Sequence, residues 1–242
     1  MAGPPILLFT DFGNTDFYVG QMHGRLVQEA PGHDLVDLHH YAPAFRPGLA
    51  GLLLEALVPF LPPEAIVVGV VDPGVGTDRG TLAVQTRGCW FVGPDNGLFG
   101  PLAREEGVAA YRLAVPGAEG ASASFHGRDI FAPGAAALAR GEDRILGSRV
   151  GEPVAGDARR DQVVYVDHYG NLLTGLVPPS GESAALQLAG RSVRPARTFG
   201  DVAPGEVFWY RNSLDRVEVA AREASAAELL GVGPGESVAW GP

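Results

Sequence analysis

Two short runs of apolar residues, each followed closely by an aspartate, constrain the fold of this chain most strongly. Pro5–Thr10 (PILLFT) leads into Asp11, and Ala65–Val71 (AIVVGVV) leads into Asp72. Continuous rather than alternating apolarity is typical of a strand that is buried on both faces of a sheet. Because ligands of open parallel sheets bind beyond the carboxyl ends of the strands, both aspartates are candidate site residues.

The stretches around these two runs predict the remaining elements of an α/β fold. Strands that are separated by helices favour parallel pairing. The expected helices are Val19–Ala30, Leu49–Val58 and Ile130–Arg140, a further strand is Asp34–Leu38, and Thr81–Gln85 forms a hairpin with Cys89–Val92. We expect Asp129 to favour the start of the third helix, because a carboxylate stabilises a helix N-terminus.

The pattern changes at residues 151–160, a polar stretch with glycines in which we place the domain boundary. Beyond it, short strand-like pieces alternate with Gly, Pro and Ser turns: Gln162–Val166, Ala184–Leu188, Val207–Tyr210 and Val217–Ala220. This pattern is typical of a small antiparallel β-barrel. We therefore predict an N-terminal α/β domain with a largely parallel central sheet (1–155) and a smaller C-terminal β-barrel domain (156–242).

Charge and cysteine content exclude several classes of protein. The formal net charge is −10, and all 18 basic side chains are arginine. Nucleic acids and anionic membranes need clustered positive charge, so we expect neither as a partner. A single cysteine excludes an intramolecular disulfide framework and a thiolate zinc site. With no secretory signal or long apolar run, the default location is the cytoplasm.

The loop that follows the first strand is the first candidate cluster. It comprises Thr10–Tyr18 (TDFGNTDFY) and contains Asp11, Asp16 and Tyr18. A carboxylate at a strand end can accept both hydroxyls of a ribose, whereas the alternative is that these acids cap the loop and the next helix. The triplet Asp-Phe-Gly also occurs in kinases, but a chain without lysine lacks the strand lysine of that class.

Two further clusters together supply an acid, a guanidinium and an imidazole. Arg79 closes the turn-forming segment Val71–Arg79 (VDPGVGTDR), which can fold its guanidinium back onto Asp72. His126 lies in Ser124–Asp129 (SFHGRD), directly before the third predicted helix. His126 can have either a functional or a structural role. For Asp72 and Arg79, the alternative is an ion pair that only holds the loop.

The C-terminal half offers a fourth cluster. Asp167, Tyr169 and Asn171 lie within one turn (DHYGN), and Ser213 and Glu218 follow later in the chain. The tyrosine ring can stack on a heterocycle while the asparagine reads its edge by hydrogen bonds. A plain hairpin turn is the alternative.

A metal centre is not expected. Asp37, His39 and His40 are close in sequence. However, adjacent histidines on a strand point to opposite faces of the sheet, so they cannot chelate one ion without distortion. We also expect no cofactor.

Five motifs occur in order along the chain: Thr10–Gly13 (TDFG), Val71–Arg79 (VDPGVGTDR), Phe91–Leu98 (FVGPDNGL), Phe125–Asp129 (FHGRD) and Asp167–Asn171 (DHYGN). Together they resemble the motifs of the S-adenosylmethionine hydrolases that form adenosine, also called S-adenosylmethionine hydroxide adenosyltransferases. This family is related to the fluorinase and chlorinase. The resemblance covers essentially the whole chain.

The resemblance implies attack of water on the 5′ carbon of S-adenosylmethionine, which releases methionine and leaves adenosine. It assigns the positioning of the water to Asp72, Arg79 and His126, and ribose binding to Asp11. It also implies a homotrimer with active sites between subunits. The remaining substrate contacts that we expect are Asp16, Tyr18, Asp167, Tyr169, Asn171, Ser213 and Glu218.

Three alternatives remain from the sequence. Chloride-dependent halogenation is disfavoured because Asp72 and Gly127 match the hydrolase pattern. In the halogenases, the resemblance places a tyrosine at the position of Asp72 and a halide-holding serine at that of Gly127. A non-catalytic sensor of adenosine or S-adenosylmethionine would bind without turnover. A metal-dependent phosphoesterase is the third and weakest alternative.

Overall fold

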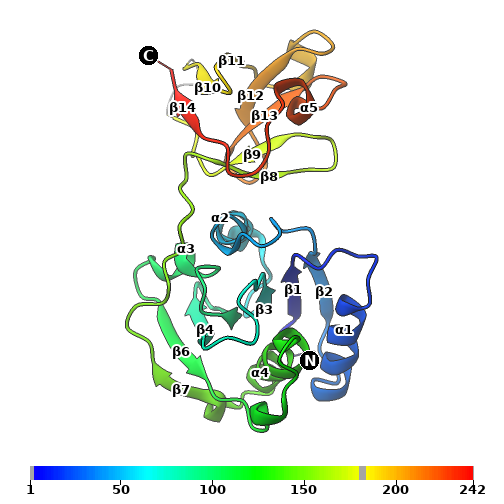
Figure 1. Cartoon of the computed structure of the whole chain (residues 1–242), viewed down its shortest axis with the longest axis vertical. Helices are drawn as coiled ribbons and strands as arrows, with labels where there is room; N and C mark the ends of the chain where they lie inside the picture. The colour runs from blue at the N-terminus through cyan, green and yellow to red at the C-terminus, as the bar shows by residue number, and fades with distance from the viewer. Residues whose placement is uncertain (1–2, 180–183, 242) are drawn as a thin grey trace. The chain divides into compact units, whose positions relative to one another are not determined.

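The computed structural model describes residues 3–179 and 184–241, which divide into two compact units. The first comprises Met1–Gly51 and Phe60–Asp157, and the second comprises Leu52–Pro59 and Ala158–Pro242. Figure 1 shows the elements of both units. Helix α2 (Pro47–Leu57), which continues into the 3-10 turn Val58–Phe60, spans the boundary between them.

The first unit is built on a seven-stranded mixed sheet with the order β2-β1-β3-β5-β4-β6-β7. Strands β2, β1, β3 and β5 run parallel, and β4, β6 and β7 continue the sheet in antiparallel fashion. The strands are β1 (Ile6–Thr10), β2 (Leu35–His39), β3 (Ile66–Val70), β4 (Thr81–Thr86), β5 (Cys89–Pro94), β6 (Ala109–Leu113) and β7 (Leu146–Arg149). The predicted largely parallel α/β sheet is confirmed, while β6 and β7 were not predicted.

The two apolar runs form the centre of this sheet, as predicted. Every residue of β1 and β3 is buried, and each strand pairs with the other in parallel register from Ile6 opposite Ile66 to Thr10 opposite Val70. Burial of two such strands on both faces explains their unbroken apolarity. Their carboxyl ends therefore lie at one edge of the sheet.

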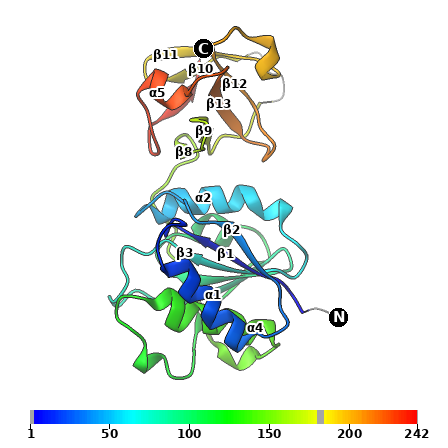
Figure 2. The same cartoon turned by 90° about the vertical axis from the view of Figure 1, so that its right-hand side faces the viewer.

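Helices α1 (Tyr18–Glu29) and α4 (Ala132–Ala139) pack together against one face of the sheet (Figure 2). The predicted helix Ile130–Arg140 needs correction, because a π-helical turn at Gly127–Phe131 precedes α4. Asp129 lies in the first turn of this helical segment, where its charge is favourable, although no side chain makes a capping hydrogen bond there. Its carboxylate instead accepts the Ser122 amide at 2.9 Å and pairs with the neighbouring Arg128.

The second unit is a nearly closed, mostly antiparallel sheet with the order β14-β10-β11-β12-β13-β9-β8. Its elements are β8 (Val163–Val166), β9 (Leu172–Thr174), β10 (Leu186–Leu188), β11 (Arg191–Pro195), β12 (Val207–Arg211), β13 (Val217–Ala221), α5 (Ala226–Leu230) and β14 (Val238–Trp240). A bridge between Gln162 and Ser237 links the two ends of the sheet. The predicted barrel is confirmed, with one parallel pair, β11 and β12, in place of the purely antiparallel pattern.

Two classes of feature are absent from the part of the chain that the structure describes. No helix there has the length and apolarity to cross a membrane. No group of three or more His, Cys, Asp and Glu side chains there is arranged to hold a metal ion.

Candidate active site

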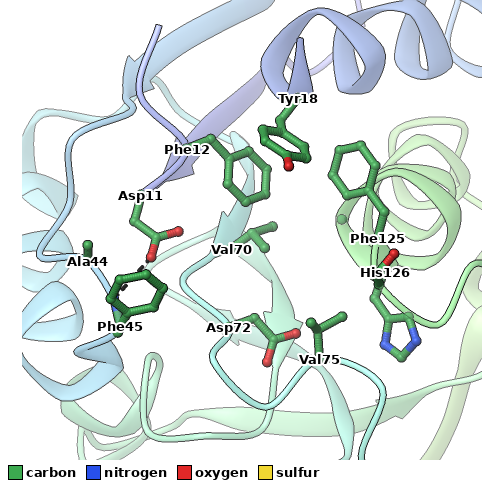
Figure 3. A pocket seen from close by; sticks show the side chains of 12 residues that line it. Asp11, Phe12, Tyr18, Ala44, Phe45, Val70, Asp72, Val75, Phe125 and His126 are labelled. Atoms are coloured by element: carbon green, nitrogen blue, oxygen red, sulfur yellow. Dashed lines mark hydrogen bonds between the residues drawn. The ribbon is translucent and has the colours of Figure 1, made fainter. Parts of the chain in front are cut away.

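A cavity of about 400 Å³ opens beyond the carboxyl ends of β1 and β3 (Figure 3). Its lining residues are Asp11, Phe12, Tyr18, Ala44, Phe45, Val70, Asp72, Val75, Ser124, Phe125, His126 and Gly127. The sequence singled out Asp11, Tyr18, Asp72 and His126 among them. The strand-end prediction for Asp11 and Asp72 is therefore correct in position: one follows β1 directly, and the other lies two residues after β3.

The segment after β2 holds the loop that carries Asp11. The Gly13 amide donates to the His40 carbonyl at 2.7 Å, and the Ala42 amide donates to the Thr10 carbonyl at 3.1 Å. The Thr10 hydroxyl lies 2.8 Å from His40 Nδ1 and accepts the Phe12 amide at 3.2 Å. Because Thr10 and His40 are both buried, these bonds fix the backbone from which the Asp11 carboxylate projects.

Asp11 itself is aimed by the backbone of Phe45. The Phe45 amide donates to Asp11 Oδ2 at 3.1 Å, and the other carboxylate oxygen points into the cavity (Figure 3). Phe45 adopts φ of 60°, a left-handed conformation that is uncommon for a residue other than glycine. Burial raises the pKa of Asp11, and this hydrogen bond opposes the rise. Asp11 can thus present one free acceptor oxygen to a hydroxyl group.

Asp72, Arg79 and His126 form one connected group. Arg79 Nε lies 2.9 Å from Asp72 Oδ1 and 3.0 Å from Oδ2, and Nη2 also donates to Oδ2. The same Nη2 lies 2.8 Å from His126 Nδ1. The side chains of Asp72 and Arg79 are only 5% and 9% exposed, so their charges compensate each other out of bulk water. The predicted return of Arg79 to Asp72 is confirmed.

This geometry determines the protonation state of His126. A guanidinium has only donors, so Nδ1 must accept and the single ring proton resides on Nε2. Burial, followed by the charge of Arg79, lowers the pKa of His126, which favours the same neutral form. His126 can therefore donate a hydrogen bond from Nε2 but offers no free lone pair.

Glycine permits the loop between Asp72 and Arg79 to approach the His126 segment closely. Gly76 has φ of +80°, and a Cβ there would lie 2.5 Å from the Ala123 carbonyl oxygen. Only glycine fits such a position without a backbone shift. The Thr77 hydroxyl, which donates to the Gly74 carbonyl at 2.7 Å, closes the turn.

The motif at Phe91–Leu98 supports the site from outside the cavity. Asn96 Nδ2 donates to the Val71 carbonyl at 2.9 Å, directly before Asp72. Asp95 accepts Arg112 Nη1 and the Val154 amide, both at 2.8 Å. These contacts give the motif a structural role in the first unit.

A second cavity, of about 720 Å³, lies in the β-barrel unit. Its lining includes four of the predicted residues, Asp167, Tyr169, Asn171 and Glu218, together with Phe199, Tyr210, Ala221, Glu223, Ala224 and Ser225. The Tyr169 ring is 75% exposed and thus available for stacking. By contrast, Asn171 is 7% exposed, and its buried Oδ1 has no hydrogen-bond partner among the described residues.

Internal contacts occupy two of the three acids of this second cavity, Asp167 and Glu218. Asp167 Oδ1 accepts the Tyr169 and Asn171 amides, each at 2.9 Å, and its Oδ2 accepts Asn171 Nδ2 at 2.9 Å. Glu218 accepts the Tyr210 hydroxyl on one oxygen. Burial, followed by the hydrogen bond to this carboxylate, raises the pKa of Tyr210. Asp167 and Glu218 therefore hold the cavity wall in place.

Three predicted site residues line neither cavity. One is Arg79, which instead contacts the cavity residues Asp72 and His126. Asp16 is exposed in the loop before α1, and Ser213 is exposed in the turn between β12 and β13. Their predicted contacts with the substrate remain predictions. Conversely, Phe12, Phe45 and Phe125 line the first cavity but were not predicted. Phe12 and Phe125 lie inside motifs that the sequence analysis recognised, beside Asp11 and His126.

The two units place this chain among two-domain proteins that combine an α/β domain with a β-barrel, and a cavity lies at the carboxyl ends of the parallel strands. Residues 6–145 match the N-terminal domain, and residues 161–239 the C-terminal domain, of the S-adenosylmethionine (SAM) hydroxide adenosyltransferases. The chain belongs to this family.

Similar proteins cover nearly the full length. The (R)-S-adenosyl-L-methionine hydrolase of Thermus thermophilus is 39% identical over 97% of this chain and 98% of its own, and that of Salinispora arenicola is 38% identical over 98% of both. A fluorinase from Actinoplanes is 25% identical over 76% of each chain. Among solved structures, an uncharacterized conserved protein from Thermotoga maritima superimposes with a TM-score of 0.88 at 28% identity, covering 98% of this chain and 100% of its own.

Proposed function

We propose that this protein hydrolyses S-adenosyl-L-methionine to adenosine and L-methionine. The observation that carries the proposal is the Asp72–Arg79–His126 group, of which Asp72 and His126 line the same cavity as the strand-end carboxylate Asp11. Support also comes from the relatives named (R)-S-adenosyl-L-methionine hydrolase, which match this chain over nearly its whole length.

In the proposed reaction, a water molecule lies between Asp72 and His126 and attacks the 5′ carbon of the ribose. The new O–C5′ bond forms as the C5′–S bond breaks, and the electron pair of that bond stays on sulfur as the thioether of methionine. Because the sulfonium sulfur is a good leaving group, orientation of the water supplies most of the rate acceleration. Asp11 would hold the ribose through its free oxygen.

Asp72 is the proposed acceptor of the water proton. His126 Nδ1 is engaged by Arg79 at 2.8 Å and its Nε2 carries the ring proton, so the imidazole can orient the water but cannot deprotonate it. The Asp72 carboxylate keeps lone pairs beyond those that Arg79 uses. From Asp72 the proton would pass to solvent.

The second cavity would bind the adenine and amino acid parts of the substrate. The unpartnered Asn171 Oδ1 suits the exocyclic amine of adenine, and Tyr169 offers a ring face for stacking. Asp167 and Ser213 would complete the contacts that the family resemblance implies, and we propose Asp16 and Glu218 as further contacts. Neither cavity alone offers partners for the whole substrate.

We further propose that the protein acts as a cytoplasmic homotrimer in which a neighbouring copy completes each site, with neither cofactor nor metal. Light scattering of the purified protein tests the trimer, and a monomer that retains full activity would contradict it. Incubation with a chelator tests the metal: we expect unchanged adenosine release, whereas loss of activity would favour the metal-dependent phosphoesterase.

The names of the relatives specify the (R) configuration at the sulfur of S-adenosyl-L-methionine. We propose the same epimer for this chain. Purified (R) and (S) epimers are incubated separately with enzyme, and adenosine is quantified by chromatography. Faster release from the (R) epimer is the expected result, and an (S) preference would contradict the assignment.

Chloride-dependent halogenation is the nearest alternative. Gly127 has no hydroxyl to hold a halide, and a Cβ there would lie 3.3 Å from Met22 Sδ and from the Phe125 ring. We expect adenosine as the nucleoside product even at high chloride, and 5′-chloroadenosine would refute the proposal. Tight binding with neither product would indicate a sensor instead.

A further inference from the structure

Three aromatic side chains form one wall of the first cavity. Phe12, Tyr18 and Phe125 contact one another with ring centroids 5.4 to 5.8 Å apart. The Tyr18 and Phe125 rings meet at 90°, and the Phe12 and Phe125 rings at 72°. Rings that meet nearly at right angles enclose a corner, which is the arrangement found in aromatic cages for onium cations.

The position of this aromatic wall relative to Asp72 and His126 determines where the leaving sulfur would lie. In Figure 3, the rings of Phe12 and Tyr18 lie across the cavity from the carboxylate of Asp72 and the imidazole of His126. Displacement at carbon requires the attacking oxygen, the carbon and the leaving atom to lie in line. A water held by Asp72 and His126 therefore requires the leaving sulfur on the side of the aromatic rings.

Two carboxylates, Asp11 and Asp72, line the first cavity. The charge of Asp72 is compensated by Arg79, and one oxygen of Asp11 is occupied by the Phe45 amide. An aromatic face can attract a cation without acting as a nucleophile toward an activated carbon. We propose that Phe12, Tyr18 and Phe125 form a cation–π site for the sulfonium of the substrate, an inference that rests on the proposed function.

This role has a kinetic signature. Sulfur is positive in the bound substrate and loses that charge as the C5′–S bond breaks, so the rings stabilise the ground state more than the transition state. Loss of an interaction of that kind raises KM and kcat together and changes kcat/KM little. A residue that only shapes the cavity would instead affect charged and neutral ligands alike.

Tyr18 allows a matched test because the residue is 37% exposed. Tyr18→Leu keeps an apolar side chain without a π face, whereas Tyr18→Phe keeps the face. The KM for S-adenosylmethionine is compared with the inhibition constant of S-adenosylhomocysteine, the neutral thioether that lacks the S-methyl group. Phe125→Leu provides a second variant, with thermal unfolding as the folding control.

We expect Tyr18→Leu to weaken S-adenosylmethionine binding about five- to tenfold and thioether binding less than about twofold. KM for S-adenosylmethionine should rise without a fall in kcat, and Tyr18→Phe should retain the ratio of the two affinities. Equal weakening of both ligands, or the same loss in Tyr18→Phe, would overturn the inference. A parent protein that releases no adenosine would instead refute the proposed function, while calorimetric titration of both ligands would still test the aromatic site.

Discussion

Replacing Asp72 should reveal how much the buried Asp72–Arg79 pair contributes to stability as well as to catalysis. Both side chains are at least nine-tenths buried, and Arg79 contacts both carboxylate oxygens through Nε at 2.9 and 3.0 Å. Removal of one partner from such a pair costs about 3–5 kcal/mol, because an uncompensated charge remains buried. For a protein of this size, that loss lowers the unfolding temperature by about 6–20 °C.

The matched double variant separates the two roles. In Asp72→Ala/Arg79→Met no buried charge is left unpaired, and replacing both partners of a buried pair by apolar groups is often close to neutral. We therefore expect the double variant to recover most of the unfolding temperature lost in Asp72→Ala while remaining inactive. Calorimetric scans and an adenosine-release assay on the parent, both single variants and the double variant complete the cycle.

Two results would refute this reasoning. If Asp72→Ala unfolds at the temperature of the parent, the pair does not stabilise the loop. If the double variant hydrolyses S-adenosylmethionine at a rate near that of the parent, Asp72 and Arg79 do not position the water.

Three further predictions concern the cavity. First, burial raises the pKa of Asp11, whereas burial and the charge of Arg79 lower the pKa of His126. Asp11 is needed as the carboxylate and His126 as the neutral imidazole, and both forms are lost by protonation as the pH falls. We therefore expect kcat/KM to decline on the acid side with a midpoint between about pH 4 and 6.5, and a profile that rises toward acid would contradict these roles. Second, Gly127→Ser should destabilise the fold, since its Cβ would lie 3.3 Å from neighbouring side chains, and should not produce 5′-chloroadenosine by chromatography. Third, Thr10→Val removes the contact with His40 and the acceptor of a loop amide, so we expect a loss of about 1–3 kcal/mol by chemical unfolding and a higher KM; an unchanged KM would show that these bonds do not orient the loop.

The sequence predicts those parts of the fold whose signal is local. Strands β1 and β3 are recognisable because they are apolar throughout and buried on both faces. Strands such as β9, with three residues, and β11, whose sequence Arg191–Pro195 is largely exposed, carry no comparable pattern. Each also pairs with a strand farther along the chain, β9 with β13 and β11 with β12, which a local reading cannot supply.

The same distinction applies to the site. Asp11 and Asp72 are predictable from their places after buried strands. The contact of Arg79 with Asp72 is predictable from the turn-forming residues between them. Phe45 is not, because its role comes from a left-handed backbone that points its amide at Asp11, 34 residues earlier in the chain. The neutral state of His126 likewise depends on a tertiary contact with Arg79.

Product analysis in water labelled with heavy oxygen tests the central claim most directly. The enzyme is incubated with S-adenosylmethionine in labelled water, and adenosine and methionine are analysed by mass spectrometry. Attack of water at the 5′ carbon, oriented by Asp72, Arg79 and His126, predicts the label in the 5′ hydroxyl of adenosine and none in methionine. Unlabelled adenosine, or label in methionine, would contradict the account.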